Sequence, residues 1–132
     1  MLTYGLVVLG VSDVRRAARF WCAALGYEIH PGPFGGFSTV LTPPGSTASA
    51  IALQPSLTLP DTTHPRMHLD LHAPTGTDQE AEAERLIQLG ATRADWDSYP
   101  ADPDFIVLAD PDGNLFCVVD LSHGQASSST GA

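Results

Sequence analysis

The sequence has no lysine and only two cysteines, and both shortages exclude certain partners and fold classes. Its six basic residues, all arginine, stand against 15 acids, so the formal net charge is −9. The excess lies in the second half, because residues 1–60 hold three arginines and two acids whereas residues 61–132 hold three arginines and 13 acids. Such a field repels phosphate backbones and anionic lipid headgroups. We therefore expect neither nucleic acid nor a membrane as a partner.

Long apolar runs, disulfide frameworks and several catalytic motifs are also missing. No apolar run approaches the roughly 20 residues that span a bilayer, and the first four residues lack the basic stretch of a secretory leader. Cys22 and Cys117 are too few for a secreted disulfide scaffold. There is no glycine-rich phosphate loop, nucleophile elbow or Cys-x-x-Cys pair. The sequence thus predicts a cytoplasmic protein whose 132 residues, 43% of them hydrophobic, bury a core in one domain.

The first part of the chain has the pattern of a β-α-β-β-β module. A short apolar run at residues 6–11 predicts a strand. Apolar residues recur every three or four positions over residues 14–25, between the capping pair Ser12-Asp13 and Gly26, and this spacing predicts a helix. The stretch that follows, rich in proline and glycine, predicts a loop or a hairpin, and two further strands are predicted at residues 37–42 and 50–54.

The same order of elements returns after a proline-containing linker. Strict alternation at residues 67–72 predicts a strand, and the capping box at residues 77–80 predicts a helix that ends at Gly90. Gly26 and Gly90 are 64 residues apart, which is the offset of the repeat. The predicted features that follow are a short strand from Ala91, an acidic loop at 95–104, and strands at 105–108 and 115–119 joined by a turn at 110–114.

These patterns predict one domain over residues 1–123. Its parts are module one at 1–55, a linker at 56–65 and module two at 66–123. The small and polar residues 124–132 predict a disordered tail.

Short motifs in both modules resemble those of the vicinal oxygen chelate superfamily, in particular its glyoxalase-like branch of glyoxalases, bleomycin resistance proteins and dioxygenases. The motifs are Ser12-Asp13, Arg19-Phe20-Trp21, residues 25–28 (Leu-Gly-Tyr-Glu), residues 66–71 (Arg-Met-His-Leu-Asp-Leu), residues 89–92 (Leu-Gly-Ala-Thr) and residues 108–118. The resemblance implies an α+β fold of two tandem βαβββ modules, with curved mixed sheets in an open barrel and helices outside. It also implies pairing of chains into homodimers.

In metal-using members of this superfamily, the resemblance implies a divalent ion held by a His, a carboxylate or Gln, a second His and a Glu. The corresponding positions here are Leu6, then Ala52 or Gln54, then His68, then Cys117. Because an aliphatic side chain cannot bind a metal, we expect the usual site to be lost and no cofactor to be needed. The alternatives are a divalent metal on His68, Gln54 and Cys117, or a new zinc site built from His68, His72, Asp70 and Cys117.

The alternating strand places His68, Asp70 and His72 on one face, which the family topology turns toward a cavity. We predict that His68 and Asp70 form a catalytic acid/base pair if the protein is an enzyme. If the protein is not an enzyme, His68 and Asp70 are polar residues of a solvated groove. Cys117 is interpreted as a small buried side chain rather than a nucleophile. The predicted ligand-binding residues are Leu6, Phe37, Gln54, His68, Asp70, His72 and Cys117.

The acidic loop contains Trp96 and Tyr99 among four aspartates. This mixture either caps a cationic or aromatic ligand or forms a solvated loop, and the second interpretation is the simpler one.

Three functions agree with this sequence. The favoured one is binding of a small apolar or aromatic molecule in the cavity without the usual metal. A second is lyase or isomerase chemistry by His68 and Asp70, and a third is a metal-dependent glyoxalase or dioxygenase. A protein-interaction module with an unused cavity is a further alternative, and the identity of the ligand stays open.

Overall fold

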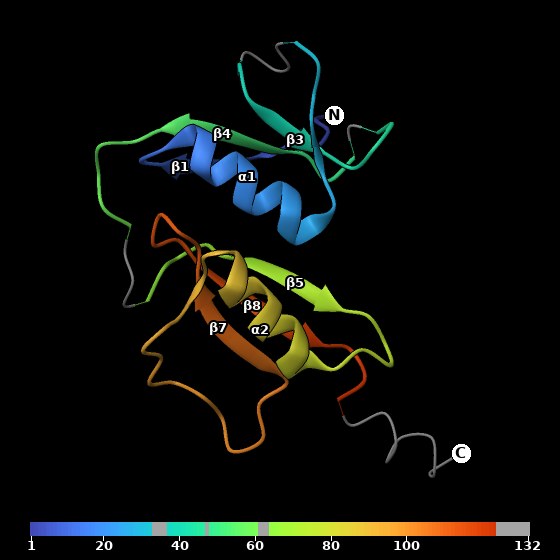
Figure 1. The fold of residues 1–132 in the computed structure, drawn as a ribbon, viewed down its shortest axis with the longest axis vertical. Helices are drawn as coiled ribbons and strands as arrows, with labels where there is room; N and C mark the ends of the chain where they lie inside the picture. The colour runs from blue at the N-terminus through green and yellow to red at the C-terminus, as the bar shows by residue number, and fades with distance from the viewer. Residues whose placement is uncertain (33–36, 47, 61–63, 124–132) are drawn as a thin grey trace. The chain divides into compact units, whose positions relative to one another are not determined.

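A computed structural model shows the fold of the chain (Figure 1). The structure describes every residue except 33–36, 47, 61–63 and 124–132, so the predicted tail lies outside the described residues. The chain divides into two compact units, residues 1–59 and 60–132, and the division falls inside the predicted linker. In the described part of the chain, no helix is long and apolar enough to cross a membrane.

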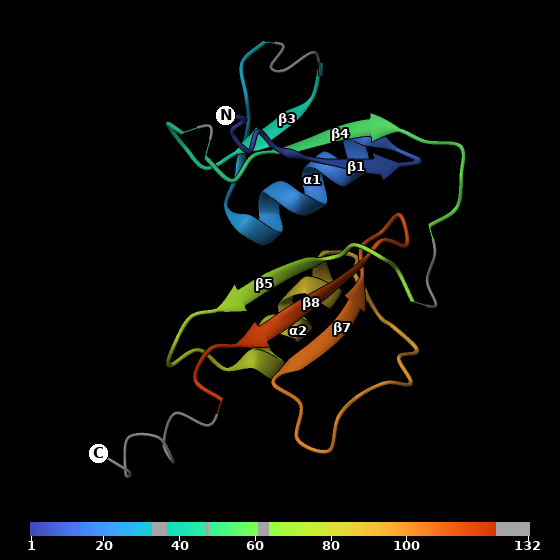
Figure 2. The same cartoon turned by 180° about the vertical axis from the view of Figure 1, so that it is seen from behind.

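The N-terminal unit is one helix on a four-stranded mixed sheet (Figures 1 and 2). The strand order is β1-β4-β3-β2, in which β1 runs parallel to β4 and the other neighbours are antiparallel. The elements are β1 (Val7–Val11), α1 (Val14–Leu25), β2 (Glu28–Ile29), β3 (Val40–Thr42) and β4 (Ile51–Pro55). This order is the predicted β-α-β-β-β module.

Helix α1 begins and ends where the sequence predicts. The Asp13 carboxylate accepts a hydrogen bond from the Arg16 amide at 3.1 Å, which caps the first turn. Gly26 takes a left-handed conformation, with φ of 70°, and donates its amide to the Cys22 carbonyl. Ala17 and Trp21 are fully buried, so this helix face packs into the core of its unit.

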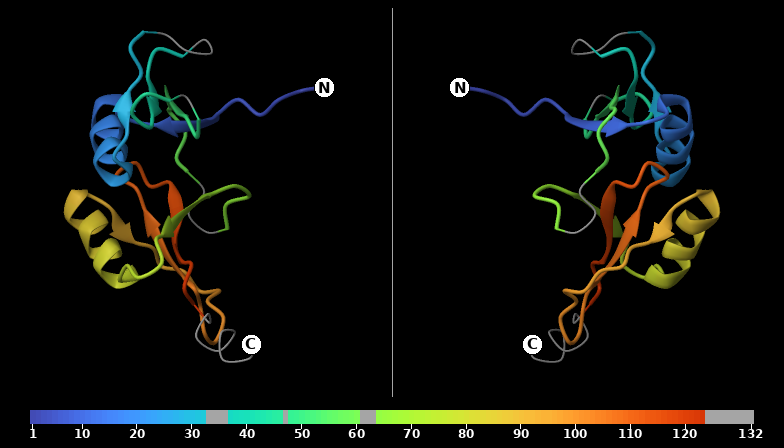
Figure 3. Two further views of the ribbon diagram at one scale, coloured as in Figure 1. Left: turned by 90° about the vertical axis from the view of Figure 1, so that its right-hand side faces the viewer. Right: turned by 90° about the vertical axis from the view of Figure 1, so that its left-hand side faces the viewer.

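The C-terminal unit repeats this plan, with helix and sheet again in two layers (Figure 3). Its strand order is β5-β8-β7-β6, with β5 parallel to β8. The elements are β5 (Leu69–Ala73), α2 (Gln79–Leu89), β6 (Thr92–Arg93), β7 (Phe105–Ala109) and β8 (Leu115–Asp120). The α+β fold of two βαβββ modules is therefore confirmed.

Several boundaries differ from the prediction. The N-cap of α2 is Asp78, whose carboxylate accepts from the Glu80 amide at 3.0 Å, and not Thr77 of the expected capping box. Strand β5 begins at Leu69, and Met67 is exposed, because the register would place Met67 opposite the turn that precedes β8. Strand β3 is shorter than predicted, and Phe37 lies before it.

The turn between β7 and β8 is organised by a buried carboxylate. Asp110 is 3% exposed, and its Oδ1 accepts the amides of Asp112 at 3.0 Å and Asn114 at 2.8 Å. Gly113 supplies the left-handed conformation, with φ of 89°, that closes the turn. The predicted turn thus sets the register of β8, the central strand of the site described next.

Candidate functional site

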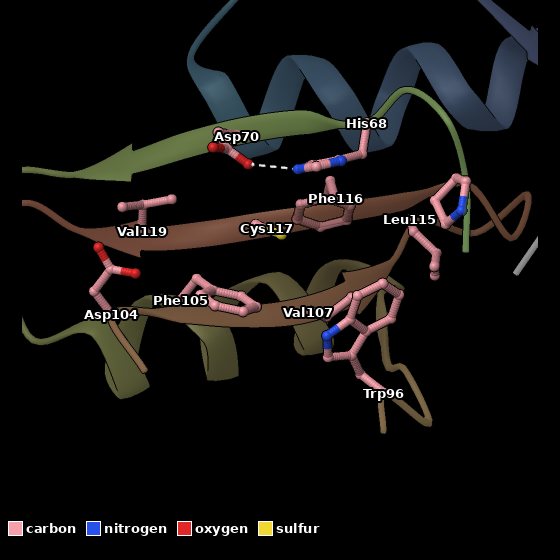
Figure 4. A pocket seen from close by; sticks show the side chains of 11 residues that line it. His68, Asp70, Trp96, Asp104, Phe105, Val107, Leu115, Phe116, Cys117 and Val119 are labelled. Atoms are coloured by element: carbon pink, nitrogen blue, oxygen red, sulfur yellow. Dashed lines mark ion pairs between the residues drawn. The ribbon is translucent and has the colours of Figure 1, made fainter. Parts of the chain in front are cut away.

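A cavity of about 320 Å³ opens on the sheet of the C-terminal unit, on the face away from α2 (Figure 4). Successive side chains of a strand point to opposite faces, so alternate residues of β7 and β8 face it. Most of the lining is aromatic or aliphatic. The lining residues are Pro65, His68, Asp70, Trp96, Asp104, Phe105, Val107, Leu115, Phe116, Cys117 and Val119.

An ion pair stands at one side of this cavity. His68 Nε2 lies 3.0 Å from Asp70 Oδ1, and both side chains are about half exposed (Figure 4). Asp70 is the second residue of β5 and His68 lies just before the strand, and residues two apart in an extended chain share a face. A carboxylate at this distance fixes the orientation of the imidazole ring at the edge of the apolar surface.

The floor of the cavity carries the Cys117 thiol. Cys117 lies opposite Asp70 in the parallel register of β5 and β8 and is buried. Burial, and then the nearby Asp70 and Asp104 carboxylates, raise the pKa of Cys117 to about 11. The side chain is therefore a neutral thiol at pH 7, as the interpretation of Cys117 as a small buried group requires.

The acidic loop is fastened to the sheet at Tyr99. The Val107 amide donates a 2.7 Å hydrogen bond to the Tyr99 hydroxyl oxygen, and the Tyr99 ring stacks on Phe105 with centroids 5.2 Å apart. Trp96 consequently lines the cavity, with the His64 ring 5.4 Å from its own. The loop is thus not merely solvated, although that was the simpler interpretation of its sequence.

Two polar groups of the cavity have no hydrogen-bond partner in the part of the chain that the structure describes. The Trp96 indole N–H is buried without an acceptor. The Asp104 carboxylate makes no hydrogen bond or ion pair there, although its backbone is anchored, since its carbonyl accepts from the Gln79 side chain at 3.0 Å and from the Asp120 amide at 2.7 Å. The backbone of Asp104 is therefore fixed, while its carboxylate stands beside an apolar surface without a partner among the described residues.

The structure brings only part of the predicted site together. His68, Asp70 and Cys117 line the cavity, whereas His72 is exposed and does not. The other predicted residues belong to the N-terminal unit. There, Leu6 and Phe37 pack against the buried cluster of Val40, Ala50 and Ala52, and Gln54 is exposed on β4.

Sequence reasoning did not assign several lining residues to the site. Val107, Leu115 and Val119 could have been found, because strand alternation places Leu115 and Val119 on the face of Cys117. Trp96 could not be assigned from a local pattern, because the Tyr99 to Val107 contact brings its loop to the sheet, and Asp104 is held just before β7 by Gln79 and Asp120.

The donor set does not fit the divalent ion that the superfamily implies. The first of its four positions holds Leu6, which cannot bind a metal, the second is either exposed Gln54 or buried Ala52, and the fourth holds a thiol where hard ions prefer oxygen. Within the described ranges, one group of three donors is close enough to hold an ion, namely His68, Asp70 and Cys117, whose ligand atoms lie within 4.8 Å of one another. These atoms suit zinc better than magnesium or manganese, provided that the thiol loses its proton.

The family model of the glyoxalase-like domain matches residues 6–119. The chain therefore belongs to the glyoxalase-like family of the vicinal oxygen chelate superfamily, as the motifs of both modules indicated. A search of curated proteins found no match.

Solved structures with the same fold cover nearly the whole chain. A glyoxalase/bleomycin resistance protein/dioxygenase superfamily member from Sphaerobacter thermophilus is 21% identical, with a TM-score of 0.61 over 91% of this chain and 98% of that chain. A possible glyoxalase from Bacillus cereus is 15% identical, with a TM-score of 0.63 over 90% and 99%. The antibiotic binding protein TnmS3 from Streptomyces sp. CB03234 is 22% identical, with a TM-score of 0.56 over 91% and 96%. At these identities the likeness shows the fold alone.

Proposed function

We propose that this protein binds a small apolar or aromatic organic molecule in the C-terminal cavity, without the usual metal. The observation that carries this proposal is a cavity of about 320 Å³ walled by Trp96, Phe105, Val107 and Leu115. Ligand pockets of small molecules start at about 300 Å³ and are mostly apolar, with few polar groups. A protein named as antibiotic binding, with the same fold, supports this kind of role.

Fluorescence titration with N-phenyl-1-naphthylamine, a neutral probe that brightens in apolar surroundings, tests this function. We expect saturable binding that Trp96→Ala weakens about fivefold, because aromatic contact contributes roughly 1 kcal/mol. The matched control is Tyr4→Ala, which removes an exposed aromatic ring from the other unit. Absence of saturable binding, or equal binding by both variants, contradicts the proposal.

A second candidate function is acid/base catalysis of the lyase or isomerase type. It is favoured by the 3.0 Å separation of His68 Nε2 and Asp70 Oδ1 at the cavity. Such a pair could move a proton next to a carbonyl group of a small substrate.

Deuterium exchange tests the second candidate. Nuclear magnetic resonance in D₂O would follow exchange at the carbon between the hydroxyl and carbonyl groups of hydroxyacetone. Catalysed exchange that His68→Ala abolishes and His72→Ala preserves would establish the acid/base role. Exchange no faster than in buffer excludes this reaction for the probe.

We also propose that the protein works as a cytoplasmic homodimer. In the described sheets, β1 pairs only with β4 and β5 only with β8, so each sheet keeps an edge that a second chain can pair with. Native mass spectrometry should find a species at twice the 13.9 kDa mass of the chain. A monomer at micromolar concentration would contradict the dimer without affecting the cavity.

A further inference from the structure

The charged groups that line the cavity are of one sign. They are Asp70 and Asp104, with His68 as the one group that can become positive. None of the six arginines lines it, and the chain has no lysine. Among the described lining residues the acidic side chains therefore outnumber the groups that can carry a positive charge.

The two carboxylates differ in what they contact. Asp70 has His68 as its partner at 3.0 Å. The Asp104 carboxylate has none among the described residues, and its backbone is held by Gln79 and Asp120. Both carboxylates act on the cavity floor, since each helps to raise the pKa of Cys117. The negative field therefore extends into the space that a ligand would occupy.

The cavity has an acidic end and an aromatic end. Figure 4 shows Asp70 and Asp104 toward one end, near Val119, and Trp96 toward the other, with Phe105 and Val107 between them. A ligand that lies along the sheet would meet carboxylates with one end and rings with the other. Organic cations are attracted both by carboxylates and by the faces of aromatic rings.

We propose that this cavity selects aromatic organic cations, with the ammonium group between Asp70 and Asp104 and the ring against Trp96 and Phe105. This inference rests on the proposed ligand-binding function and adds the charge of the ligand to it. An anion of the same shape would meet the unpaired Asp104 carboxylate, with Asp70 beside it and no arginine in the described lining, and would be excluded.

Three probes that share one ring system and differ in charge test the inference. They are 2-naphthylmethylamine, which is a cation at pH 7.5, neutral 2-naphthalenemethanol and anionic 2-naphthoate. Isothermal titration calorimetry at low salt should give the cation about tenfold tighter binding than the alcohol and no measurable binding of the anion. The advantage of the cation should shrink at 0.5 M NaCl, because salt screens a half-exposed site.

Asp104→Asn should reduce the advantage of the cation about threefold to fivefold and leave alcohol binding unchanged. The matched control is Asp102→Asn, which removes the same charge from the same loop at a side chain that is 88% exposed and does not line the cavity. An equal effect of both variants would mean that the net charge of the protein, rather than the cavity, attracts the cation. That result overturns the inference.

The outcomes separate this inference from the proposed function. Equal binding of the cation and the alcohol overturns charge selection but keeps the cavity as a binding site. Failure of all three naphthyl probes and of N-phenyl-1-naphthylamine overturns both.

Discussion

The two units share one order of strands and helix, but only the C-terminal unit has ionisable side chains at the positions of His68, Asp70 and Cys117. When β1 and β4 are aligned with β5 and β8 by their registers, the facing pair Val8 and Ala52 corresponds to Asp70 and Cys117. Leu6 then corresponds to His68. A buried apolar cluster lies on this face in both units, formed by Val40, Ala50 and Ala52 in the first and by Val107, Leu115 and Cys117 in the second. In the N-terminal unit Leu6 packs against the cluster, whereas in the C-terminal unit His68 and Asp70 stand beside it and line a cavity.

The largest expected effect tests what the units have in common. Leu41 of β3 and Leu108 of β7 are both fully buried, so Leu41→Ala and Leu108→Ala should each lower the free energy of unfolding by about 2–5 kcal/mol. Urea denaturation measures the loss, and exposed Leu57→Ala is the control. A loss below 1 kcal/mol in one unit would show that its core is not packed as the structure has it.

A smaller effect is expected at the turn that positions β8. Asp110→Ala leaves the part-buried amides of Asp112 and Asn114 without their acceptor, so we expect a loss of about 1–3 kcal/mol in the free energy of unfolding. The counterpart in the N-terminal unit is Asp13→Ala, which removes a helix cap and should cost about 1 kcal/mol. The same urea titration ranks the two variants. A larger loss in the free energy of unfolding for Asp13→Ala than for Asp110→Ala would contradict the prediction that the Asp110 turn stabilises the fold more than this helix cap does.

The comparison also shows what could be read from the sequence. Helix boundaries were predictable because Gly26, Asp13 and the spacing of apolar residues act locally, and the repeat identified the second module. Strand ends were less predictable, since β5 starts where its partner β8 starts. In the site, His68, Asp70 and Cys117 follow from strand alternation. Trp96 depends on the hydrogen bond between Tyr99 and Val107, and Asp104 on bonds to Gln79 and Asp120, and no local pattern reveals these contacts.

The two cysteines give a chemical comparison of the units. Burial raises the pKa of Cys22, whereas burial together with Asp70 and Asp104 raises that of Cys117 to about 11. At pH 8 about one Cys117 thiol in a thousand is ionised, so iodoacetamide should modify it slowly, with a rate that rises up to pH 11.

Asp70→Asn removes one negative charge and a hydrogen-bond acceptor beside that thiol. The pKa of Cys117 should fall, and its modification at pH 8 should become a few times faster while that of Cys22 stays unchanged. Mass spectrometry of tryptic peptides separates the two sites. An unchanged rate at Cys117 would show that burial alone holds its proton.

The smallest expected effect is that of added metal, because Leu6 and Cys117 stand at the positions where metal-using members have a His and a Glu. Protein purified without a histidine tag should contain no stoichiometric metal, and Mn²⁺, Fe²⁺ or Ni²⁺ should leave its melting temperature within about 1 °C, since only a ligand bound to the native state raises stability. Zn²⁺ is the sharper test. A rise of several degrees in the melting temperature that Cys117→Ser abolishes and Cys22→Ser preserves would assign an ion to His68, Asp70 and Cys117. It would overturn the hypothesis that the cavity works without a metal.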